Sequence, residues 1–360
     1  MNCSKQSGTA QTACLDSELI PLIYRAWRRP VSSTQKAKIY EFFNGVSFSD
    51  GVHSALLYTF LSPKFLYVSY DAGPTATRLN SFEIAERLTF LIWGTVPDQE
   101  ILDQVKNNEL SSLDSLKNLA IALLNNRTKS QKFFETFTKE WLSLDELDHA
   151  QRTDSKFTPS LAKSLSLEVA HHFEELFRKN RPIKELLTSN FSIMSRDVAA
   201  LYNVDWDAAP VWDIDRSGKY KKVQLSGNRN GLLTLAGVLT SNAMSKSHAS
   251  ATQRGYWATK RIICKKPGDI PDDVSLEIKP IQASARKQLE NHVKSVACQK
   301  CHSIMDPIGF GFGNFDALGQ YITKDGFNYD VDASGTILNK NFSNAPEMVD
   351  VFAEAQEVEN

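Results

Sequence analysis

The chain has 360 residues, of which 42% are hydrophobic and 23% are charged, an ordinary globular balance that excludes extended disorder. Its formal net charge of -1 excludes a global electrostatic field that would recruit nucleic acid or an anionic membrane. No apolar run approaches the roughly 18 residues that a spanning helix needs. We therefore expect no nucleic-acid partner and no transmembrane segment.

The first three-quarters of the chain carries apolar residues at helical spacing. The predicted helices run from about 16 to Pro30, then from 33, and over 50–61, 81–94, 114–125, 129–145, 160–178 and 190–202. His171 and His172 are expected as surface or capping residues of their helix, and Met194 as an apolar contact on the last one. This pattern predicts a mainly α fold.

The character of the sequence changes after about residue 205. The predicted elements are a hairpin of 211–214 with 220–225, a helix at 253–263, a linker at 267–280, a helix from Ile281 into Cys298, Gly-rich loops, a second hairpin near 328–338 and a short helix near Pro346. Asp306-Pro307 is typical of a turn that ends a helix, although it can also shape a binding pocket. We expect small β-hairpins within this helical region.

The chain has five cysteines, at positions 3, 14, 264, 298 and 301. Cys3 and Cys14 lie close together at the N-terminus and are the expected disulfide pair in an oxidising compartment. Cys264 would then be free, and we expect it to be a small buried apolar residue.

Cys298, Cys301 and His302 form a CxxCH motif. Two thiols three residues apart on a helix face one side, so both can add to the vinyl groups of one porphyrin, and the following histidine can ligate the iron. A zinc site completed by Cys264 and His292 is one alternative, and a thioredoxin-like thiol pair is another. The motif favours one covalently attached haem c, with His302 as the proximal iron ligand.

The segment 298–319, CQKCHSIMDPIGFGFGNFDALG, resembles the haem-binding module of the planctomycete-type cytochrome c proteins. The matching motifs are Asp306-Pro307, Gly309-Phe310, Asn314-Phe315-Asp316 and Gly319, and the segments 26–30, 61–66, 85–98 and 254–257 resemble the other modules of the family. Gly313 departs from the family, which often has Glu there. The resemblance covers nearly the whole chain.

This resemblance implies helical modules at 1–78 and 79–205, a haem module at 206–325 and the start of a C-terminal module at 326–360. It also implies that Asp306, Pro307 and Phe310 belong to the haem pocket. Asp306 is placed to hold the ring N–H of His302. Gly309, Gly311 and Gly313 are expected to let the backbone pass close to the porphyrin.

The second axial ligand cannot be read directly. Met244 and His248, in the polar stretch 241–250, are the first candidates, and Met348 is the next. Met305 is three residues from His302 on the proximal side, so we do not expect it to cross the ring.

The leading function is single-electron transfer to or from a redox partner protein. The alternatives are a haem enzyme of peroxidase or oxidase type and an electron-feeding subunit of an oxidoreductase complex. Haem is attached to paired cysteines outside the cytoplasm, so the periplasm, cell envelope or extracellular space is the expected location. No apolar signal-peptide stretch follows Met1, and we therefore expect a mature or truncated form.

Overall fold

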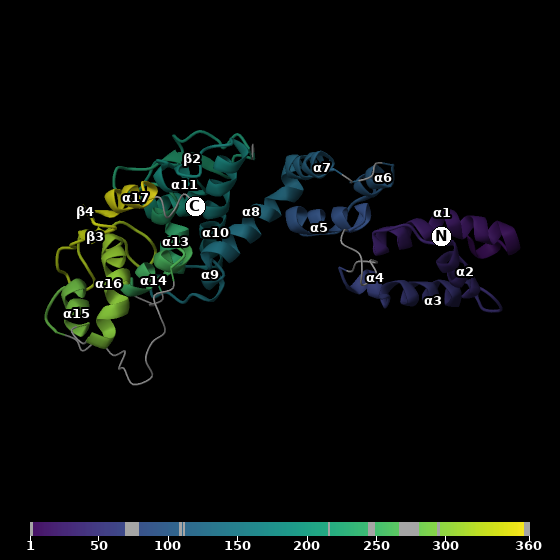
Figure 1. Ribbon diagram of the computed structural model, residues 1–360, viewed down its shortest axis with the longest axis horizontal. Coiled ribbons are helices and arrows are strands. Elements are labelled where there is room, and N and C mark those ends of the chain that lie inside the picture. Colours follow the sequence, from purple (N-terminus) through teal and green to yellow (C-terminus); the bar gives the residue numbers. More distant parts are fainter. Residues whose placement is uncertain are drawn as a thin grey trace. The chain divides into compact units, whose positions relative to one another are not determined.

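The computed structural model describes residues 3–68, 79–107, 110, 112–214, 217–243, 249–265, 281–293 and 296–355. It is mainly helical and contains two small antiparallel sheets of two strands each in its described part (Figure 1), which confirms the predicted fold class. The chain divides into two compact units, Met1–Phe133 and Phe134–Asn360. The four modules read from the sequence stay a prediction. Within the described ranges, no helix combines the length and apolarity needed to cross a membrane.

The first unit is built from helices. They are η1 (Cys3–Lys5), α1 (Gly8–Trp27), α2 (Ser33–Glu41), α3 (Phe48–Phe60), α4 (Pro63–Leu66), α5 (Ser81–Trp93), α6 (Gln99–Asn107), α7 (Leu113–Asn125) and the start of α8 (Arg127–Leu142). Sequence signals explain the ends of α5: Asn80 and Glu83 form a reciprocal capping box, and Gly94 ends the helix in the left-handed conformation. Helix α6 was not predicted from the sequence, and α1 begins at Gly8 rather than near residue 16 as predicted.

The first unit has two apolar cores. One is formed by α1, α2 and α3 around Leu19, Ile23 and Ile39, and the other by α5, α6 and α7. A disulfide between Cys3 and Cys14 joins η1 to α1. It is the pair suggested by the cysteine count.

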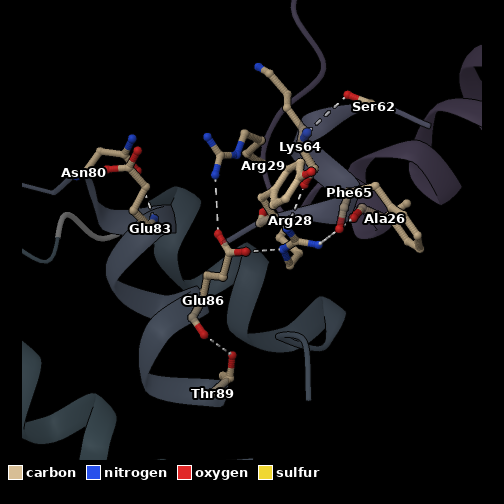
Figure 2. Close-up of polar contacts among 11 residues, drawn as sticks. Ala26, Arg28, Arg29, Ser62, Lys64, Phe65, Asn80, Glu83, Glu86 and Thr89 are labelled. Carbon is tan, nitrogen blue, oxygen red and sulfur yellow. Dashed lines mark hydrogen bonds and ion pairs between the residues drawn. The ribbon is translucent and has the colours of Figure 1, made fainter. Parts of the chain in front are cut away.

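A buried ion cluster links α1 and α4 to α5 (Figure 2). The guanidinium of Arg28, directly after α1, donates to Glu86 on α5 and to the carbonyl oxygens of Lys64 and Tyr67. Arg29 reaches the other carboxylate oxygen of Glu86 at 3.3 Å. Glu86 is fully buried, so its charge depends on these two cations.

The second unit continues α8 and adds the remaining elements. They are α9 (Glu146–His149), α10 (Pro159–Arg178), α11 (Glu185–Thr188), β1 (Phe191–Met194), α12 (Arg196–Tyr202), β2 (Lys221–Gln224), η2 (Leu232–Thr234), α13 (Ala236–Ser241), α14 (Ala251–Arg261), α15 (Ala285–His292), α16 (Val296–Gly311), β3 (Gly335–Ile337), β4 (Lys340–Phe342) and α17 (Ala345–Ala353). One large apolar core unites α10, α13, α14, α16 and α17. The haem motif therefore belongs to a helix anchored in this core.

The prediction of a single helix over 190–202 is wrong, because the segment contains strand β1 followed by α12. Met194 is a buried strand residue, and β1 pairs with β2 so that Phe191 lies opposite Gln224. The predicted hairpin of 211–214 with 220–225 reduces to an isolated bridge between Val211 and Lys221. A short strand whose partner lies thirty residues away leaves no local periodic signal.

The second hairpin lies later than predicted, at β3 and β4, with Gly335 opposite Phe342.

Two expectations about the burial of side chains are also wrong. His171 and His172 are both buried on α10, where His171 contacts the ring of Trp212 and His172 contacts the ring of Phe191. Cys264 is exposed rather than buried, because it follows the end of α14 in the left-handed conformation.

Candidate haem-binding site

The CxxCH motif occupies the first turns of α16, and this corrects the sequence reading, which placed it at the end of a helix that began at Ile281. That stretch contains a separate helix, α15, and α16 begins at Val296. The helix then continues through Asp306 and Pro307 to Gly311, so Asp306-Pro307 is not a helix-ending turn. Close packing against α14 and the side-chain contacts of Asp306 hold this proline-containing segment in the helix.

Helices α14 and α16 approach each other through glycines. A Cβ added at Gly255 would overlap the carbonyl oxygen of Met305, and one added at Gly309 would overlap the carbonyl oxygen of Ala251. The two backbones therefore lie closer than side chains would allow. A Cβ at Gly311 would meet the sulfur of Met348. Gly309 and Gly311 thus serve helix packing, and the expectation that they make room for a porphyrin stays a prediction.

His302 is held by a carboxylate one turn further along the same helix. Its Nδ1 lies 2.9 Å and 3.0 Å from the two carboxylate oxygens of Asp306. Thr252, at the start of α14, donates its hydroxyl to Asp306 at 3.1 Å. Because an ionised carboxylate only accepts hydrogen bonds, Nδ1 carries the proton and Nε2 keeps its lone pair.

Asp306 is 5% exposed. Burial raises the pKa of this carboxyl above its ordinary value, while the contacts with His302 and Thr252 act in the opposite direction. The imidazole of His302 keeps part of its surface open, with 18% of the side chain exposed. The ring is therefore oriented from one side and accessible from the other.

A cavity of about 590 Å³ lies between α15, the start of α14, the end of α16 and the loop around 322–332. Its walls combine apolar rings, including Phe310 and Phe315, with the charged side chains of Arg254 and Arg286. Arg254 is fully buried and donates to the carbonyl oxygens of Phe312 and Phe315, which fixes the turn after α16. The three CxxCH side chains are not among the wall residues, and Pro307 is not among them either.

The cavity and the motif share one face of α16. His302, Asp306 and Phe310 follow each other at intervals of four residues, which places them in a row along the helix. On α15, Arg286 stacks over Phe310 at 4.4 Å and donates to the carbonyl oxygen of Ser334. Helix α15 therefore lies over the end of this row that forms the cavity wall.

The other end of α15 approaches the motif. The rings of His292 and His302 have their centroids 6.3 Å apart, with an angle of 74° between their planes. In the sequence, His292 is a candidate only as a zinc ligand. The helical spacing of His292 after Ala285, Gln288 and Leu289 places it on the face of α15 whose earlier residues line the cavity.

The donor set fits a covalently attached haem. Two thiols and an imidazole follow each other at the start of one helix, and the imidazole has its second nitrogen held by a carboxylate. The zinc alternative lacks a ligand set in the described part of the chain, where no three His, Cys, Asp or Glu side chains converge on a metal position.

The structure describes only some of the residues that the sequence offers as the second axial ligand. Met244 and His248 lie outside the described residues. Met348 is fully buried in the large core, and Met305 is 6% exposed with its carbonyl group against α14.

Comparison with known proteins gives two family matches. Residues 79–204 match the model described as PSD4, a protein of unknown function (DUF1592), and residues 229–325 match the model described as PSCyt3, a protein of unknown function (DUF1588). Both models are planctomycete cytochrome c families, which supports the resemblance seen in the sequence. No curated protein and no solved structure matches the chain significantly.

Proposed function

We propose that this chain, of which two segments match planctomycete cytochrome c families, is a c-type cytochrome that transfers single electrons. The observation that carries the proposal is the pairing of a CxxCH motif with a carboxylate that orients its histidine. Neither feature depends on the family match. A helix that presents two thiols and an oriented imidazole side by side is suited to hold a haem covalently.

Each residue of the site has a separate task. Cys298 and Cys301 would hold the porphyrin through thioether bonds to its two vinyl groups. His302 offers Nε2 to the iron, and Asp306 holds the Nδ1 proton and keeps the ring in place. The bound haem supplies an iron that gains and loses one electron.

The location that we propose is outside the cytoplasm. Covalent haem attachment to paired cysteines takes place there, and the disulfide between Cys3 and Cys14 needs an oxidising compartment. The helical first unit offers a surface on which a redox partner protein could dock.

A potentiometric titration of the purified haem-loaded chain tests the proposal. We expect a reversible transition that follows a one-electron Nernst curve and the absence of peroxidase turnover above that of free haem. Peroxide turnover with a high-spin resting spectrum would contradict an electron carrier and favour a haem enzyme.

A further inference from the structure

The neighbouring rings of His292 and His302 point to the second axial ligand, an inference that rests on the function proposed above. The two side chains come from different helices, α15 and α16, and their ring centroids are 6.3 Å apart. Two imidazoles that bind one ion from opposite sides, each at a metal–nitrogen distance of about 2 Å, have centroids roughly 6 Å apart. The observed separation equals that of a ligand pair.

The angle between the rings is compatible with the same arrangement. When two imidazoles bind one ion in line, both ring planes contain the common nitrogen–metal–nitrogen axis. The planes are then free to rotate about that axis, and the observed 74° is an allowed value. An edge-to-face contact of two unliganded rings has the same angle, so the spectroscopic test below separates ligation from simple packing.

The helix faces around the two histidines are also suitable. Gln288 and Leu289, one turn before His292, line the cavity of about 590 Å³, and Phe310 lines it from α16. Phe310 lies eight residues beyond His302, about 12 Å along the helix. The face of α15 that carries His292 and the row of α16 that carries His302 therefore both lead to the walls of this cavity.

The other candidate axial ligands among the residues that the structure describes are less suitable than His292. Met348 packs in the core against Gly311, and Met305 is buried with its backbone carbonyl against α14. Among the candidate side chains that the structure describes, the ring of His292 is the one that lies beside His302.

We infer that His292 would serve, with His302, as the second axial ligand of the haem iron. A histidine pair gives a six-coordinate, low-spin iron with a lower reduction potential than a histidine–methionine pair. This arrangement suits an electron carrier, because a fixed ligand on each side keeps the geometry constant between oxidation states.

The test uses the full chain, matured with covalent haem, and records electron paramagnetic resonance and near-infrared magnetic circular dichroism. We expect a low-spin His–His signature for the wild type. His292→Ala should keep its covalent haem but lose this signature and become high-spin, and added imidazole should restore it. His53→Ala, at an exposed histidine on α3, is the matched control and should leave the spectrum unchanged.

A low-spin spectrum unchanged in His292→Ala would overturn the inference, as would a His–Met signature in the wild type that disappears in Met244→Ala. If His292→Ala does not fold, His292→Met keeps a ligating side chain and should convert the His–His signature into a His–Met one; an unchanged signature again overturns the inference. A wild-type chain that releases its haem on denaturation contradicts the proposed function itself, so the two failures are distinguishable.

Discussion

His302 donates its Nδ1 proton to Asp306, whose two carboxylate oxygens lie at 2.9 Å and 3.0 Å. The contact spans one helical turn of α16, so it is fixed by the helix itself. It determines the tautomer of the imidazole and turns Nε2 toward a ligand. The carboxylate also increases the electron-donating strength of the ring, which favours the more positive state of a bound iron.

Asp306→Asn should therefore raise the midpoint potential of the haem, because a neutral amide is a weaker acceptor for the Nδ1 proton. We expect a rise on the order of 60 mV, which is equivalent to a tenfold change in a one-electron equilibrium. Thr252→Val removes a competing donor to Asp306 and should shift the potential the other way. Redox titration measures both, and equal shifts in the same direction would contradict a role through His302.

Gly309→Ala should destabilise the second unit by about 1–3 kcal/mol, because the new methyl group meets the backbone of α14, which cannot yield locally. The sign of this change in the free energy of unfolding is informative, because a Gly to Ala substitution inside a helix usually stabilises a protein by up to about 1 kcal/mol. Gly227→Ala is the control, because a Cβ there has open space. Urea denaturation followed by circular dichroism gives the comparison, and a stabilised Gly309→Ala would show that the close approach of α14 and α16 is absent.

Glu86→Ala should loosen the first unit, because it removes the buried carboxylate that both Arg28 and Arg29 contact. Removing one partner of a buried ion pair costs about 3–5 kcal/mol. Hydrogen exchange of α4 and α5 peptides should show this loss of protection. Glu41→Ala, which breaks an exposed pair with Lys38, should leave the stability nearly unchanged, and equal effects of the two variants would contradict the buried cluster.

His172 should make stability depend on pH. Burial lowers the pKa of His172 from 6.5 to about 4, with the nearby Glu175 raising it and Lys222 lowering it further. Between pH 6.5 and 4 the unfolded state binds the proton more readily, so stability is complete above pH 6.5 and falls as the pH drops toward 4.

The loss through this window amounts to roughly 3 kcal/mol at its acidic end. His172→Gln does not titrate there, so its urea midpoint should depend less on pH than that of the wild type. His53→Gln, at an exposed site, serves as the control. Identical pH profiles for wild type and His172→Gln would show that the folded protein accepts a proton on His172 without cost.

The features that could be predicted from the sequence depend on residues that lie close together in the chain, such as helix caps and short motifs. The helix at 81–94 was recognisable because Asn80 caps its start and Gly94 ends it, and the structure has α5 at Ser81–Trp93. The motif of Cys298, Cys301 and His302 is visible in the sequence because it depends on spacing within five residues, and its attachment of haem stays a prediction. The contact between His302 and Asp306 was expected for the same reason, since both lie on one helix.

The errors come from partners that are distant in the chain. Strand β1 is defined by its pairing with β2, and α16 continues past Pro307 because α14 packs against it. His292 was overlooked as a neighbour of His302, since the two rings meet only when α15 folds over α16. Hydrophobic periodicity reports none of these contacts.

Covalent haem attachment tests the central claim most directly. The full chain, expressed with a c-type haem maturation system, should keep one haem through denaturing electrophoresis and show a mass increase of one haem by intact-mass spectrometry. The double variant Cys298→Ala with Cys301→Ala should lose both signals, and Cys264→Ala, at an exposed cysteine outside the motif, should keep them. Haem that extracts freely into acidified acetone from the intact wild-type chain would contradict the account.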